Sequence, residues 1–177
     1  MRSIAKVGFD VVQDEWRRAD QGRSGGSTLG LLGPFFELEW WRVEVDWQNL
    51  STVLTIHSNK RNGETNQWEF LSSGTYRFPD IADAVLRGES GTAAGKVRRY
   101  AENVVTWRCR PIFVTDSIEN GLIMCVDGCN RLAAAFLRRA QNLAQPIPET
   151  LVGQGETAKP ETLNQVFGFE LGRRKSP

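Results

Sequence analysis

The sequence predicts an α+β fold in which an antiparallel β meander precedes a core of strands and helices. From 36 to 47, apolar and polar residues alternate with the two-residue period of a half-buried strand. Farther along, the apolar run 122–126 ends at Asp127-Gly128 and leads directly into an alanine-rich amphipathic segment, the pattern of strand, tight turn and helix. With 177 residues, 40% hydrophobic and 24% charged, the composition is that of one globular domain, 1–177.

The segment 1–99 carries the tryptophan-rich meander together with helices. Its alternation changes phase at Trp40-Trp41, which predicts a β-bulge or a strand break there. Further strands are expected at 52–57 and 67–71, with Asn62-Gly63 as the turn between them.

The tryptophans of the meander have two interpretations: a wide aromatic core, or an exposed platform for a partner protein or a base. A regular strand cannot bury both alternating sets on one face. At least one of Trp40, Trp41 and Trp47 is therefore expected at a dimer or ligand interface.

Other elements are expected from their periodicity. Residues 4–20 could form one helical face, and 21–33 is a loop or boundary because it is rich in Gly and Ser. The remaining expected elements are helices at 79–87, 96–105 and 130–143 and a strand at 110–114.

Composition excludes several classes of protein. The net charge of +1 gives no strong field for DNA, so nucleic acid is not the favoured partner. Three irregularly spaced cysteines argue against a disulfide framework or a zinc site, and the single histidine, His57, excludes histidine triads. Neither a signal peptide nor a membrane-spanning run is expected, which favours a soluble, cytoplasmic protein.

The segment that begins at Asp127-Gly128 has the residues of an anion site. A helix N-terminus directs free N–H groups and a positive dipole end at one point. Arg131 in the first turn is either an ordinary surface arginine or a phosphate clamp, and the turn before it favours the clamp. Cys129 lies where a helix N-terminus lowers a thiol pKa.

The stretch VDGCNRLAAAF, residues 126–136, resembles two signatures of one fold superfamily. It is similar to the Gly-Gly-Cys-His-Arg motif of sulfiredoxins and to the Asp-Gly-x-x-Arg-Leu-x-Ala motif of ParB-like N-terminal domains. The similarity covers about 100–152, where a strand at 110–114 precedes the motif and one at 147–152 follows the helix. It implies a ParB/sulfiredoxin-like core and tail at 100–177 with 1–99 as an N-terminal extension.

The resemblance implies binding of ATP or CTP, usually with magnesium, and hydrolysis of the nucleotide or phosphoryl transfer. Two residues depart from the sulfiredoxin pattern: Asn130 stands where that motif has His, and Asp127 where it has Gly. Asn cannot act as a base, and a carboxylate beside the Cys129 thiol opposes thiolate formation. Catalytic candidates are therefore Asp127, which alternatively orients the turn, and Cys129, which alternatively only fills it.

The predicted nucleotide-binding set combines the turn with a preceding basic cluster. It consists of Gly128, Cys129, Asn130, Arg131, Arg108 and Arg110, with no residue assigned as a metal ligand. The predicted function is an NTP-dependent hydrolase or phosphotransferase that uses a phosphate site at a helix N-terminus. The alternatives are a DNA-associated ParB-like binding protein, or an interaction or regulatory module that kept the fold without the chemistry.

Overall fold

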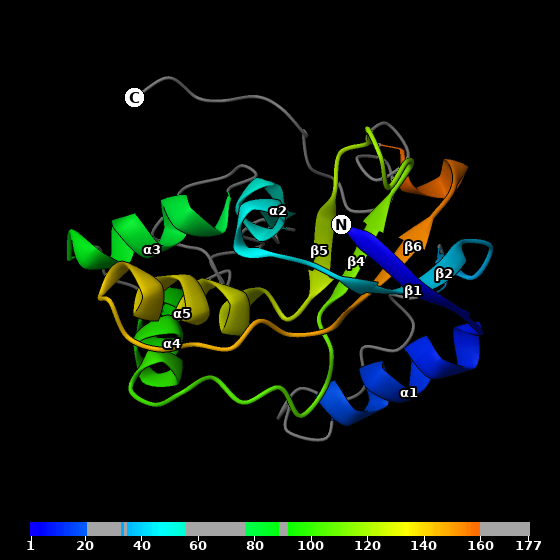
Figure 1. Cartoon of the computed structure of the whole chain (residues 1–177). Helices are drawn as coiled ribbons and strands as arrows, with labels where there is room; N and C mark the ends of the chain where they lie inside the picture. The colour runs from blue at the N-terminus through cyan, green and yellow to red at the C-terminus, as the bar shows by residue number, and fades with distance from the viewer. Residues whose placement is uncertain (21–32, 34, 56–76, 89–91, 160–177) are drawn as a thin grey trace, which may run out of the picture.

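The computed structural model describes residues 1–20, 33, 35–55, 77–88 and 92–159. These residues form a mixed α and β structure with a six-stranded sheet and five α-helices (Figure 1). The elements in chain order are β1 (Arg2–Val7), α1 (Phe9–Asp20), β2 (Glu39–Glu44), α2 (Trp47–Thr52), β3 (Leu54–Thr55), α3 (Phe78–Leu86), α4 (Thr92–Ala101), β4 (Ile112–Thr115), β5 (Met124–Asp127), α5 (Cys129–Ala140), β6 (Thr150–Gln154) and a 3-10 turn at Glu156–Ala158.

The sheet joins strands from both halves of the sequence in the order β1-β2-β6-β4-β5-β3. The pairs β4–β6 and β3–β5 are parallel, and the other three pairs are antiparallel. The strands of the N-terminal segment therefore extend the same sheet as the strands around the motif. All four residues of the central strand β4 are buried.

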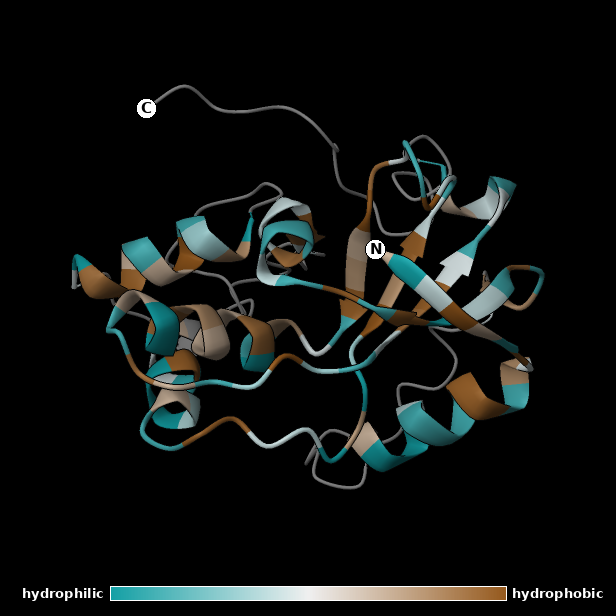
Figure 2. Ribbon diagram, in the orientation of Figure 1, coloured by the Kyte–Doolittle hydropathy of each residue, from teal (hydrophilic) through white to brown (hydrophobic). Residues whose placement is uncertain are grey.

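Both faces of the sheet are covered by helices. On one face α1 packs Val12 and Trp16 into an apolar cluster with Ile112 and Leu151. On the other face α3 and α4 both pack against α5, and Leu132 of α5 lies fully buried in the second cluster. Figure 2 shows hydrophobic and hydrophilic residues interspersed along α1, as an amphipathic helix between a sheet and solvent requires. By contrast, α5 is buried along most of its length, because α3 and α4 pack against it.

The prediction of a β meander over residues 36–47 is wrong, because this range contains a single strand, β2. Trp40 is buried in the α1-side cluster, whereas Trp41 packs against the cluster beneath α3–α5. The phase change therefore reflects a strand buried on both faces. The bulge or break expected at Trp40-Trp41 is absent, since β2 pairs with β6 there without a register shift. An irregularity lies instead in β1, where Ser3 pairs with Val43 but Ala5 pairs with Arg42.

The tryptophans at 41 and 47 are half-buried by intramolecular contacts. Trp47 begins α2 and packs edge-on against Phe136 of α5 at a centroid distance of 5.2 Å, and Arg139 lies 4.4 Å from its ring centroid. Lys6 lies 5.8 Å from the ring centroid of Trp41. The expected interface at these tryptophans stays a prediction.

Most expected elements after residue 77 are confirmed, with shifts at their ends. The helix expected at 79–87 is α3, the strand at 110–114 is β4, and the helix at 130–143 is α5, which ends at Ala140. The helix expected at 96–105 begins four residues earlier and ends at Ala101 as α4. The helix expected at 4–20 forms only over Phe9–Asp20, as α1, because residues 4–7 belong to β1.

Three expectations lie outside the described residues: the turn at 62–63, the strand at 67–71 and, except for residue 33, the loop at 21–33. Of the strand expected at 52–57, only Leu54–Thr55 is strand among the described residues, as β3, whereas Thr52 is the last residue of α2. Among the described helices, none has the length and apolarity needed to cross a lipid bilayer.

Candidate functional site

The predicted anion site lies where β5 passes into α5. The Leu132 N–H donates to the Gly128 carbonyl at 2.9 Å, which begins the helical hydrogen bonding. Gly128 has a φ of 93°, and a Cβ at this position would lie 3.2 Å from the Pro111 Cβ. Left-handed backbone and close approach both favour glycine here. The strand–turn–helix geometry expected from the sequence is confirmed.

The Arg131 guanidinium is held mainly by protein atoms. Its Nη1 donates to the Cys109 carbonyl at 3.1 Å and contacts Cys109 Sγ at 2.7 Å, while Nη2 donates to Asp127 Oδ2 at 3.3 Å. Its carbon Cζ lies 5.9 Å from the ring centroid of Trp107, and the side chain is only 16% exposed. Arg131 thereby ties the start of α5 to the segment that leads into β4.

The turn residues 127–129 of the motif are buried, and Asn130 is half-buried. Cys129 and Asp127 are buried, and Cys129 Sγ donates to the Cys125 carbonyl at 3.5 Å. Asn130 Oδ1 is buried without a hydrogen-bond partner among the described residues. A catalytic role for Asp127 or Cys129 stays a prediction, and it requires this junction to open toward a substrate.

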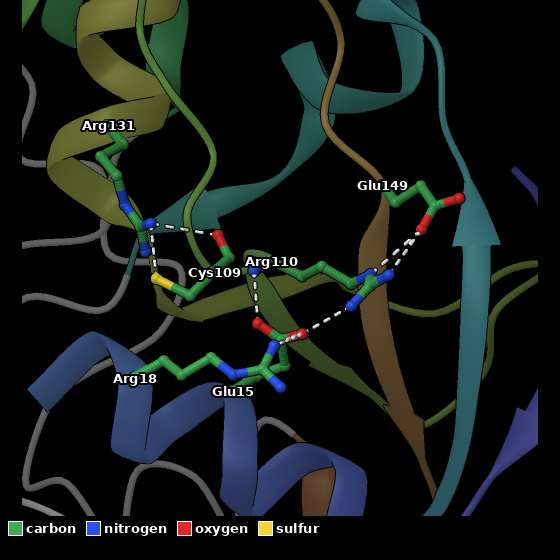
Figure 3. Close-up of polar contacts among 6 residues, drawn as sticks. All are labelled: Glu15, Arg18, Cys109, Arg110, Arg131 and Glu149. Atoms are coloured by element: carbon green, nitrogen blue, oxygen red, sulfur yellow. Dashed lines mark hydrogen bonds and ion pairs between the residues drawn. The ribbon is translucent and has the colours of Figure 1, made fainter.

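Arg110 is held between two glutamates of unequal burial (Figure 3). Glu15, which is 3% exposed, accepts from the Arg110 backbone N–H at 3.0 Å, from the Arg110 guanidinium, and from Arg18 at 3.3 Å. Glu149, which is 47% exposed, accepts from Arg110 Nε at 3.1 Å. Burial opposes the charge on Arg110, but the hydrogen bonds with Glu149 and Glu15 outweigh it and raise the pKa of the guanidinium.

A cleft opens beside this network, between α1 and the segments 107–110 and 147–149, with a volume of about 290 Å³. Three arginines, two glutamates and a tryptophan contribute to its lining: Arg18, Arg108, Arg110, Glu15, Glu149 and Trp107. Arg108 is exposed and forms no ion pair with any residue that the structure describes. Arginine therefore outnumbers acid in this lining, and Arg108 has no ion-pair partner among the described residues.

The structure brings only part of the predicted binding set together. Arg108 and Arg110 line the cleft, and Arg131 contacts Cys109, which lies between them and lines the same cleft. Gly128 and Asn130 are not part of this lining.

Sequence reasoning missed Glu15, Arg18, Trp107 and Glu149 as members of one site. The sequence does contain a sign of Glu15, because it lies three residues after Val12 on the helical face that includes Trp16. An acidic residue on an apolar face indicates a buried partner.

Stability at alkaline pH is expected to depend on two buried thiols. Burial raises the pKa of Cys125 well above its ordinary value, and burial also raises that of Cys109 although Arg131 acts in the opposite direction. Below the ordinary thiol pKa of about 8.5, both thiols are protonated in the folded and in the unfolded chain, and their contribution to the free energy of unfolding is fully present. It is lost as the pH rises from that value through the raised folded-state pKa values, because the unfolded chain releases these protons first.

Urea unfolding measured from about pH 7 to pH 10 checks this expectation. The Cys125→Ala variant should show a smaller loss of unfolding free energy over that range than the wild type, whatever its stability at neutral pH. Parallel pH profiles for the two proteins would contradict the expectation.

In comparisons with known proteins, no family model, no curated protein sequence and no solved structure matched this chain.

Proposed function

We propose that this chain is a nucleotide-binding protein with a ParB/sulfiredoxin-like core, and that the phosphates bind in the arginine-lined cleft. The observation that carries the proposal is the placement of Arg18, Arg108 and Arg110 around this cleft, next to the Arg131–Cys109 contact. Guanidinium groups pair with phosphate through charge-assisted, often bidentate hydrogen bonds. The cleft volume of about 290 Å³ lies just below the usual range for ligand sites, so it suits the phosphates and part of a nucleoside.

Each charged side chain has a distinct part in the proposed binding. Arg108 is exposed and forms no ion pair within the described part of the chain, so it meets the ligand first. Arg110 exchanges the half-exposed Glu149 carboxylate for a phosphate at small cost, because exposed ion pairs contribute little. Glu15 is buried and keeps Arg110 aimed at the cleft.

Trp107 adds an aromatic surface to the same lining, against which a ribose or a base can pack. This combination of aromatic surface and guanidinium groups favours a nucleotide over inorganic phosphate.

The proposal is first that the chain binds a nucleotide, and second that it hydrolyses the nucleotide or transfers a phosphoryl group. Mg²⁺ would enter with ATP or CTP, whose phosphate oxygens supply most of its ligands. Among the described residues, no group of three or more His, Cys, Asp or Glu side chains is placed to hold a metal. Hydrolysis or phosphoryl transfer would depend on positioning and charge neutralisation by the arginines rather than on the buried Cys129 thiol.

Replacing Arg108 by alanine is expected to weaken nucleotide binding roughly 10- to 100-fold, because one charge-assisted contact is lost. Calorimetric titration of ATP, CTP and ADP, with and without Mg²⁺, measures the affinity of wild type and variant. The melting temperature should not change, because Arg108 is exposed and forms no ion pair with the described residues.

Lys96→Ala is the matched control, since it removes one exposed positive charge from α4, outside the cleft lining. Equal affinities for the two variants would contradict the cleft as the site, and absence of any nucleotide binding by the wild type would reject the function. Salt-dependent retention of DNA without nucleotide binding would support the DNA-associated alternative instead.

A further inference from the structure

Two cysteine sulfurs lie in contact across the β5–α5 junction. Cys125 Sγ and Cys129 Sγ are 3.5 Å apart, one on the second residue of β5 and the other on the first residue of α5. Both thiols are free, and both are buried in the cluster beneath α3–α5. The proposed binding in the cleft does not use either of them.

We propose that Cys125 and Cys129 form a reversible intramolecular disulfide on exposure to hydrogen peroxide or a small organic hydroperoxide. The bond would close a loop of five residues around Asp127-Gly128. The sulfurs would have to approach from 3.5 Å to a bonding distance of about 2.05 Å. Gly128 lies within this loop, and its freedom from side-chain sterics makes it the residue best able to absorb the adjustment.

The reaction proceeds in two balanced steps. First, the Cys129 thiolate attacks one oxygen of hydrogen peroxide, giving a Cys129 sulfenic acid and releasing hydroxide, which the proton lost by the thiol converts to water. With an organic hydroperoxide the leaving group is the alkoxide, which the same proton converts to the alcohol. Second, Cys125 sulfur attacks the sulfenic sulfur, and the S–S bond forms as the hydroxyl leaves with the Cys125 proton as a second water. The two thiols lose two electrons in total, and one peroxide accepts them.

Burial sets the order of these steps. Cys129 keeps 8% of its surface exposed, whereas Cys125 has none, so a molecule as small as peroxide reaches Cys129 first. Burial keeps the Cys125 thiol protonated and slows its attack, but its contact with Cys129 makes the second step intramolecular. Cys109 is also buried, but its sulfur contacts the Arg131 guanidinium rather than a second sulfur. It therefore serves as an internal reference for thiol oxidation without a partner.

The bond can be identified directly in the wild-type chain. Trypsin together with a protease that cuts before aspartate separates the three cysteines, because trypsin does not cut Arg110-Pro111 and an aspartate lies between Cys125 and Cys129. The three fragments are 109–115, 116–126 and 127–131. Folded protein is treated with hydrogen peroxide, its remaining thiols are alkylated, and the digest is analysed by mass spectrometry without reductant.

The expected product is fragment 116–126 joined to fragment 127–131, with loss of two thiols per chain and recovery of both on reduction. Cys109→Ser should give the same linkage, and Cys129→Ser should abolish it. Wild-type protein in urea is the control for proximity, since an unfolded chain should also link Cys109. The proposal is overturned if folded wild type links 109–115 to another fragment, or if Cys125 and Cys129 remain unlinked while Cys109 oxidises. The wild-type digest decides the question even if a variant fails to fold.

Discussion

Replacing Glu15 by alanine is expected to lower the free energy of unfolding by about 2–3 kcal/mol. The change removes a buried acceptor and leaves the Arg110 backbone N–H, now hydrogen-bonded at 3.0 Å, without that partner. It also deprives Arg110 and Arg18 of their shared carboxylate. For a chain of this size the melting temperature should fall by about 4–12 °C, which calorimetry or urea unfolding measures.

Glu149→Ala is the matched control, because Glu149 pairs with the same guanidinium from an exposed position. Its expected cost is below about 1 kcal/mol. Glu15→Gln removes the charge but keeps the side-chain volume and one acceptor oxygen. Its loss of unfolding free energy should therefore lie between those of Glu149→Ala and Glu15→Ala. If Glu15→Ala and Glu149→Ala destabilise the protein equally, Glu15 does not anchor the segment before β4.

The junction at 126–136 could be predicted from sequence because its causes are local. An apolar run, an Asp-Gly turn and an amphipathic helix follow one another without a linker, and the structure has β5, Gly128 and α5 in those places. The helical period also predicted the buried positions Leu132 and Phe136.

The cleft could not be predicted because its residues meet only through tertiary packing. Glu15 and Arg110 are 95 residues apart in sequence, and Glu149 reaches the same guanidinium from the segment before β6. The region of β2 was wrongly predicted as a meander for a related reason. Apolar residues that alternate in two opposite phases are found in two successive strands and also in one strand that is buried on both faces. Periodicity alone does not distinguish these cases.

Arg131→Met is expected to lower the free energy of unfolding by about 2–4 kcal/mol. Arg131 donates to the Cys109 carbonyl and to the Asp127 carboxylate, and it packs against Trp107, so its loss separates the start of α5 from the segment 107–110. Methionine keeps much of the apolar stem volume, so the effect measures the guanidinium contacts rather than a cavity. Urea unfolding gives the free energy, and near-ultraviolet circular dichroism should change with the environment of Trp107.

Arg131→Lys tests whether the planar, forked guanidinium is required. Lysine keeps the charge, but its single ammonium group is poorly suited to donate to the Cys109 carbonyl and the Asp127 carboxylate while also lying over the Trp107 ring. We therefore expect the free energy of unfolding to fall by about 1–2 kcal/mol. Comparison with Arg108→Ala assigns the two arginines their roles: loss of nucleotide binding at unchanged stability is expected at Arg108, and loss of stability at Arg131. If Arg131→Lys is as stable as the wild type and has lost nucleotide binding, Arg131 contacts the phosphate itself, and the predicted site at the α5 N-terminus replaces the cleft.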